Sequence, residues 1–217
     1  MPAEPLESLP TTTPPRQLRS RATMERVLTA VEELLVDKPF DQITIAEIAA
    51  RASSSPTSIY ARFTDKSGLL LAAHERFKHQ AEKRLRAQID SGELADLAPR
   101  QIFDAFVQDL VSTFRTSHNL LRSVVLADSP VMYERAAMLI TTTAQGLAEQ
   151  LRPAMTVDYE VGECSIAFAV RAATAVMQQH VIFEDRAFGQ LQLNDNQLAA
   201  QLSDLLTTTT ASIFRQG

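Results

Sequence analysis

The chain has 217 residues, of which 45% are hydrophobic and 22% are charged, so it can bury a core as one or two globular domains. Its net charge of −5 argues against a general nucleic-acid binder, and its single cysteine excludes an intrachain disulfide framework and a cysteine-rich zinc site. No apolar run approaches about 18 residues and no signal-peptide pattern opens the sequence, so we expect a soluble, cytoplasmic protein with no membrane partner.

Residues 1–15 are rich in proline and threonine, a composition typical of a disordered arm. A first helix is predicted over about residues 17–37, because apolar residues recur there at the 3.6-residue period of a helix. This core stripe consists of Met24, Val27, Leu28, Val31, Leu34 and Leu35.

Two short helices joined by a polar turn are predicted within residues 44–66. Thr44 and Glu47 stand at the spacing of a capping box, and Ile43 and Ile48 flank it at the spacing of a hydrophobic staple. The second helix is expected to begin at Pro56 after three serines, because serine caps free N–H groups and proline at the first helical position costs no hydrogen bond. This layout describes a helix-turn-helix, whose second helix enters the DNA major groove by its N-terminal end.

Six further helices are predicted after this turn, which makes nine in an all-α chain. Proline or capping signals mark most of their starts, as at Asp65, Pro99, Pro130 and Asn194. The expected ranges are about 66–89, 99–116, 118–127, 130–151, 159–184 and 195–214.

Charge is divided unevenly along the chain. Residues 16–86 carry 13 basic and 9 acidic side chains, whereas residues 87–217 carry 8 basic and 15 acidic ones. A basic segment followed by an acidic one favours a protein that contacts DNA at one end only. The alternative is a chance distribution over solvated helix faces.

The segment from about residue 16 to 76 resembles the DNA-binding domain of the TetR (tetracycline repressor) family of bacterial regulators. The resemblance rests on three motifs: Ile-Thr-Ile-Ala-Glu-Ile-Ala over residues 43–49, Ser-x-x-Ser-Ile-Tyr-x-x-Phe over residues 55–63, and Asp65-Lys66 followed by Leu69-Leu70. The chain departs from the family at two places. Ser53 and Ser54 replace the usual Gly and Val of the turn, and Ala61-Arg62 replaces an aromatic-His pair. The turn is affected most, because glycine adopts a positive φ readily and serine does so reluctantly.

The resemblance implies a helix-turn-helix DNA-binding domain over residues 16–65 and an effector-binding and dimerisation domain over residues 66–217. Thr57 and Ser58 can contact base edges, Arg62 is the strongest donor near the groove, and Tyr60 matches the family's phosphate-binding tyrosine. Lys66 can bind a phosphate at a helix N-terminus or pair with Asp65. The arginines after the arm can contact DNA or form a solvated helix turn. The candidate DNA-binding residues are Arg16, Arg19, Thr44, Ser55, Pro56, Thr57, Ser58, Tyr60, Ala61, Arg62 and Lys66.

The C-terminal helices carry apolar residues that form a plain core or line a cavity, and the resemblance favours a cavity for a small-molecule effector. The candidates are Phe103, Phe106, Leu110, Phe114, Met132, Met138, Phe168, Arg171 and Met177. Arg171 lies in an apolar run, where a buried cation needs either a ligand or an acidic partner such as Glu163 or Asp104. His118 and His180 are weaker candidates, and Cys164 is expected to be a small core residue.

The resemblance also implies a homodimer through the last two helices, because symmetric dimers read two DNA half-sites. The alternative is that these helices form an internal core pair. No catalytic constellation, cofactor motif or metal spacing is present, so an enzyme is not expected. The sequence therefore predicts a ligand-responsive transcriptional regulator, most simply a repressor released from operator DNA by an apolar or amphipathic effector. The alternative is a helical ligand-binding or adaptor protein with a decayed DNA-binding head.

Overall fold

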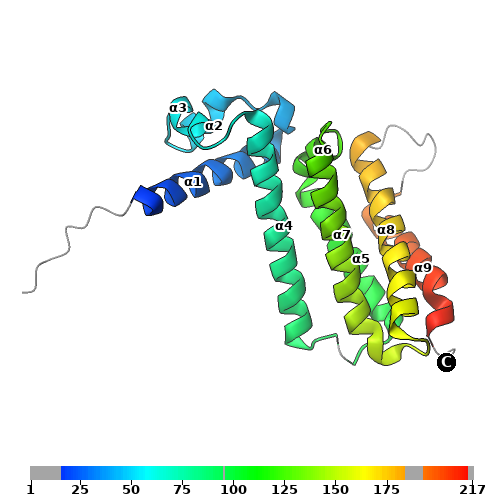
Figure 1. The fold of residues 1–217 in the computed structure, drawn as a ribbon. Helices are drawn as coiled ribbons and strands as arrows, with labels where there is room; N and C mark the ends of the chain where they lie inside the picture. Colours follow the sequence, from blue (N-terminus) through cyan, green and yellow to red (C-terminus); the bar gives the residue numbers. More distant parts are fainter. Residues whose placement is uncertain (1–15, 95, 184–192, 215–217) are drawn as a thin grey trace, which may run out of the picture.

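The computed structural model describes residues 16–94, 96–183 and 193–214, and these residues form an all-helical fold (Figure 1). The predicted arm over residues 1–15 lies outside the described residues, as do the side chains of Arg16 and Arg19. Within the described ranges there are nine α-helices, three short 3₁₀ helices and one isolated β-bridge, between Met155 and Phe214. The all-α prediction is therefore confirmed. No helix in these ranges is long and apolar enough to span a membrane.

The helices begin and end close to the predicted positions. The last one ends at Thr210, four residues before its expected end, and a 3₁₀ helix follows it. The α-helices are α1 Arg16–Asp37, α2 Ile45–Arg51, α3 Pro56–Tyr60, α4 Lys66–Ser91, α5 Pro99–Thr116, α6 His118–Val125, α7 Pro130–Leu151, α8 Tyr159–Phe183 and α9 Asp195–Thr210. The 3₁₀ helices are η1 Phe40–Gln42, η2 Arg152–Ala154 and η3 Ala211–Ile213.

Side-chain caps explain why the helix starts could be predicted. Thr44 and Glu47 form the predicted capping box of α2, and Asn194 and Gln197 form that of α9. The Asp65 carboxylate accepts a hydrogen bond of 2.7 Å from the Gly68 N–H at the start of α4. Each such cap stabilises its helix by roughly 1 kcal/mol and depends only on residues within one turn.

The first three α-helices and η1 form a compact head at one end of α4. Val27 and Val31 of α1 are fully buried, as are Ile43, Ile48 and Ile59 from the segment that contains α2 and α3. Met24 is an exception to the predicted stripe. Its side chain is 37% exposed.

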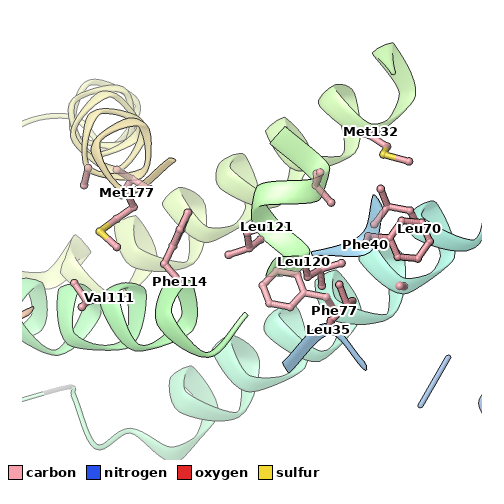
Figure 2. Close-up of a cluster of buried hydrophobic side chains, with 14 of the residues drawn as sticks. Leu35, Phe40, Leu70, Phe77, Val111, Phe114, Leu120, Leu121, Met132 and Met177 are labelled. Carbon is pink, nitrogen blue, oxygen red and sulfur yellow. The ribbon is translucent and has the colours of Figure 1, made fainter. Parts of the chain in front are cut away.

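Helices α5 to α9 form the body, and α4 runs from the head along it (Figure 1). Helix α7 packs on α4 and α8, while α9 packs on α5 and α8. Figure 2 shows that buried side chains continue from Leu35, Phe40 and Leu70 near the head to Val111 and Met177 in the body. One continuous core therefore connects the two parts.

Candidate functional site

The turn between α2 and α3 requires a left-handed residue, and Ser53 occupies that position with φ of 47°. The N–H of Ser54 donates to the Ala49 carbonyl at 2.9 Å, and the N–H of Ser53 donates to the Ala50 carbonyl at 3.3 Å. This pair of bonds is the Schellman arrangement, which normally places glycine at the left-handed position. The turn geometry is thus the one that glycine favours, although this chain carries serine.

Ser53→Gly is expected to stabilise the protein by about 0.5–1 kcal/mol. The substitution removes the steric strain of the Cβ atom at a left-handed position, and this gain is larger than the entropic cost of glycine, which is more flexible in the unfolded chain. Ser54→Gly is the matched control, since Ser54 has no positive φ and should lose stability instead. Urea unfolding measures both values. Equal effects of the two substitutions would contradict this assignment of strain to Ser53.

Helix α3 presents a small exposed face. Ser55, Pro56, Thr57 and Ala61 are exposed, and Tyr60 is 54% exposed. The Ser55 hydroxyl caps the helix by accepting from the N–H of Ser58 at 3.1 Å. Ile59 and Phe63 hold the opposite side of this segment in the core. Five of the sequence-predicted contact residues therefore lie together on one accessible surface, whereas Ser58 is half-buried.

Arg62 does not project from that surface as a free cation. Its Nη1 donates to the carbonyl of Ser58 at 2.7 Å and to the hydroxyl of Ser58 at 2.9 Å. Its Nε is buried without a partner among the described residues. The guanidinium therefore packs back onto α3 and engages the half-buried Ser58, which was predicted to contact bases. Whether either residue contacts DNA stays a prediction.

Thr44 and Lys66 are also held by neighbouring groups. The Thr44 hydroxyl donates to Glu47 at 2.8 Å, and Lys38 donates to the same carboxylate at 2.6 Å. The hydrogen bond from Lys38, followed by those from Thr44, lowers the pKa of Glu47 to about 2. Lys66 donates to the Asp41 carbonyl at 2.9 Å and lies 5.1 Å from the ring centre of Phe40. The partner of Lys66 in this structure is thus η1, rather than Asp65.

A cavity of about 510 Å³ lies between α4 and the body. Of the predicted effector residues, Phe106, Leu110 and Phe114 line it. Figure 2 shows Phe114 together with Leu121 and Phe77, which line the cavity from α6 and α4. Its remaining walls come from α7 and α8 and include Leu139, Ile140, Thr143, Val170 and Thr174. A volume of this size and a mostly apolar lining are typical of small-molecule sites.

Three predicted residues are buried but do not line this cavity. Phe103 packs edge-on against Phe214, with ring centres 6.1 Å apart. Met132 and Met177 are each 2% exposed and belong to the general core. These three residues therefore belong to the hydrophobic core, which was the alternative to a cavity lining.

The prediction that three further residues line the cavity is wrong. Met138 is 57% exposed, Phe168 is 66% exposed, and Arg171 is also exposed. Residues 166–177 are apolar around most of the helix, so periodicity alone could not show which face of α8 is buried. Arg171 therefore needs no buried partner. His118 and His180 do not line the cavity, and Cys164 is exposed rather than in the core.

His74 is a cavity residue that the sequence reasoning missed. Its side chain is 1% exposed, stacks on Phe77 with ring centres 6.2 Å apart, and lines the cavity. Burial is the main cause that lowers the pKa of His74, so the ring is neutral at pH 7. The sequence did indicate that His74 is buried, because position 74 lies four residues after Leu70 and three before Phe77, on the apolar face of α4.

Helix α6 connects the cavity to the head, which the sequence did not reveal. The Asn119 side-chain amide donates to the Leu35 carbonyl of α1 at 2.9 Å, and the Ser123 hydroxyl accepts from the Phe40 N–H at 3.1 Å. Leu121 and Val124 of the same helix line the cavity. In Figure 2, Leu120 lies in the same group as Leu35 and Phe77. One short helix therefore contacts both parts through different faces.

Residues 27–73 match the family model described as bacterial regulatory proteins, tetR family. The chain carries a TetR-family DNA-binding domain. The matched segment covers the second half of α1, all of α2 and α3 and the start of α4, which confirms the TetR resemblance seen in the sequence. The TetR family consists of transcriptional regulators rather than enzymes. No curated protein matches the chain in sequence.

Solved structures share the TetR-family fold over nearly the whole chain. A regulator assigned to the TetR family from Mesorhizobium loti has a TM-score of 0.69 and 16% identity, covering 91% of this chain and 99% of its own. A transcriptional regulator from Cytophaga hutchinsonii has a TM-score of 0.67 and 14% identity, covering 89% and 100%. The regulator FadR from Bacillus subtilis, solved with stearoyl-CoA, has a TM-score of 0.57 and 14% identity, covering 87% and 98%. At these identities the likeness establishes the fold alone.

Proposed function

We propose that this protein is a cytoplasmic, homodimeric transcriptional repressor that leaves its operator when a small apolar or amphipathic molecule binds in the body. The observation that carries this proposal is the connection of a TetR-family DNA-binding domain to a cavity of about 510 Å³ through α4 and α6. We place the domain boundary at the start of α4, with the DNA-binding domain over residues 16–65.

DNA contact is assigned to the exposed face of α3. Thr57 offers a hydroxyl and a methyl group to base edges, while Tyr60 reaches a phosphate. Because Arg62 and Lys66 are engaged by Ser58 and Asp41, this face offers few free cations of its own. Specificity then depends on both half-sites of a dimer and on DNA shape.

Dimerisation is assigned to an exposed apolar seam on α8. Val161, Phe168, Val176 and Phe183 are exposed at intervals of seven or eight residues, which places them along one side of the helix. Leu205 of the neighbouring α9 is 37% exposed. A row of exposed apolar side chains of this kind marks an interaction site, and a second copy of the chain offers the same seam in return.

The effector is assigned to the cavity. Apolar walls favour an apolar or amphipathic molecule, and the B. subtilis regulator of the same fold was solved with stearoyl-CoA, which is amphipathic. A ligand that presses on α4 and α6 biases the positions of both helices. Both helices also contact the head. The ligand therefore shifts the population toward dimers in which the separation of the two heads no longer fits the two half-sites of the operator.

Gel-shift with the DNA upstream of the protein's own coding region tests the proposal, using a shuffled duplex of equal length as control. We expect specific binding that weakens as salt rises, because phosphate contacts release counterions. Thr57→Asp and Tyr60→Asp should each abolish the shift. If the wild-type protein binds no duplex at low salt, the DNA-binding role is overturned and a ligand-binding or adaptor protein with a decayed head is favoured.

A further inference from the structure

His74 is a buried residue of the cavity wall, and one of its ring nitrogens has no hydrogen-bond partner in the part of the chain that the structure describes. His74 is 1% exposed, and its Nδ1 has no hydrogen-bond partner among the described residues. A buried polar atom without a partner costs about as much as a lost hydrogen bond, so natural proteins retain few of them. Because His74 is one of the residues that line the cavity, a molecule bound beside the ring can supply the missing partner.

The groups around His74 do not satisfy it. Glu75 is the nearest acid in the sequence, and its carboxylate pairs with Arg135 at 2.6 Å and lies 4.0 Å from Lys78. Glu82 also lies 4.0 Å from Lys78, so the group consists of two cations and two anions that balance one another. The other buried residues of the wall are apolar, except for Thr174, whose hydroxyl donates to the Val170 carbonyl at 2.8 Å; the apolar ones are Phe77, Phe114, Leu121, Val124 and Val170.

The other end of the cavity is open and carries the charges. Arg84, Glu93 and Asp109 line it and are exposed, which gives two carboxylates against one guanidinium. The charged residues at this opening give an anionic ligand little net electrostatic attraction. The neutral ring at the buried end offers no cation to pair with such a ligand. The arrangement therefore fits an uncharged ligand better than an anionic one.

We propose that the cavity binds an uncharged, mainly apolar molecule whose hydroxyl group enters first and hydrogen-bonds to the ring of His74. A hydroxyl both donates and accepts, so it can pair with Nδ1 in either neutral tautomer of the imidazole. This inference rests on the proposed effector cavity and adds the chemical class of the ligand and its anchoring atom. It also connects the ligand directly to α4, the helix that begins in the head.

Matched pairs of probes that differ by one hydroxyl test this inference: naphthalene with 1-naphthol, and biphenyl with 4-phenylphenol. Calorimetry on the full-length protein gives the ratio of the two dissociation constants in each pair. We expect the hydroxylated probe to bind the wild type about 5- to 10-fold more tightly, which is the contribution of one buried hydrogen bond. His74→Phe should bring the ratio to about one while retaining the hydrocarbon, and His74→Gln should restore part of the preference.

The outcomes separate the inference from the proposed function. Equal binding of both probes by the wild type, or an unchanged ratio in His74→Phe, overturns the role of His74 and leaves the effector cavity in place. Absence of binding by all four probes overturns the cavity as a site for such molecules, and the inference with it. The wild-type ratio decides the matter even if a His74 variant does not fold.

Discussion

Phe168→Glu is expected to convert the proposed dimer into monomers and to lower operator affinity at least 100-fold. Phe168 lies in the middle of the exposed seam of α8 and is 66% exposed in the single chain. Burying this side chain in both copies contributes about 3–6 kcal/mol to a symmetric interface, and glutamate removes that gain and adds charge repulsion. A change of that size corresponds to a factor of 100 or more in the association constant.

Sedimentation and gel-shift experiments measure the two effects of Phe168→Glu. Met138→Glu provides the matched control, because Met138 is a similarly exposed apolar residue on α7 but lies outside the seam. We expect the control to remain dimeric and to bind DNA normally. If Phe168→Glu is also dimeric, the seam is not the interface; if both variants are monomeric, the interface extends over α7.

The double variant Asn119→Ala, Ser123→Ala is expected to keep operator binding while reducing the effect of a bound ligand on it about 10-fold. Both side chains are hydrogen-bonded to the head, at Leu35 and Phe40, whereas neither lines the cavity. Coupling between two sites amounts to 1–3 kcal/mol in typical allosteric proteins, so the loss of two connecting bonds removes a large share of it.

The coupling is measured as the ratio of operator affinities with and without a saturating probe such as 1-naphthol. Thr141→Ala, Thr116→Ala is a suitable control, because within the described ranges both hydroxyls bond only to carbonyls of their own helices in the body. The control should retain the wild-type ratio. A wild-type ratio in the Asn119, Ser123 variant would show that α4 alone transmits the signal.

Local chemistry allowed most of the fold to be predicted. The capping box of Thr44 and Glu47, the Asp65 cap and the proline starts of α3, α5 and α7 each act within one helical turn. Their effect does not depend on what the helix packs against, so the helix starts could be found without tertiary information. The exposed face of α3 could be predicted for the same reason, since its exposed and buried positions follow the helical period.

The cavity and the exposed apolar seam of the body depend on long-range packing instead. Phe168 and Phe114 are both phenylalanines on apolar stretches of predicted helices. In the structure, Phe168 is exposed on α8, whereas Phe114 of α5 lines the cavity. Likewise, Arg62 and Lys66 are engaged by groups whose positions follow from the packed head.

The sequence by itself determined the helices, their order and the DNA-binding motif, because short-range hydrogen bonds and apolar periodicity specify these features. The tertiary structure alone decided which apolar residues line a cavity and that α6 connects the cavity to the head. It also decided that Nδ1 of His74 has no hydrogen-bond partner among the described residues. The physical reason is distance along the chain: the bond between Ser123 and Phe40 joins residues 83 positions apart, and no local pattern encodes such a pair.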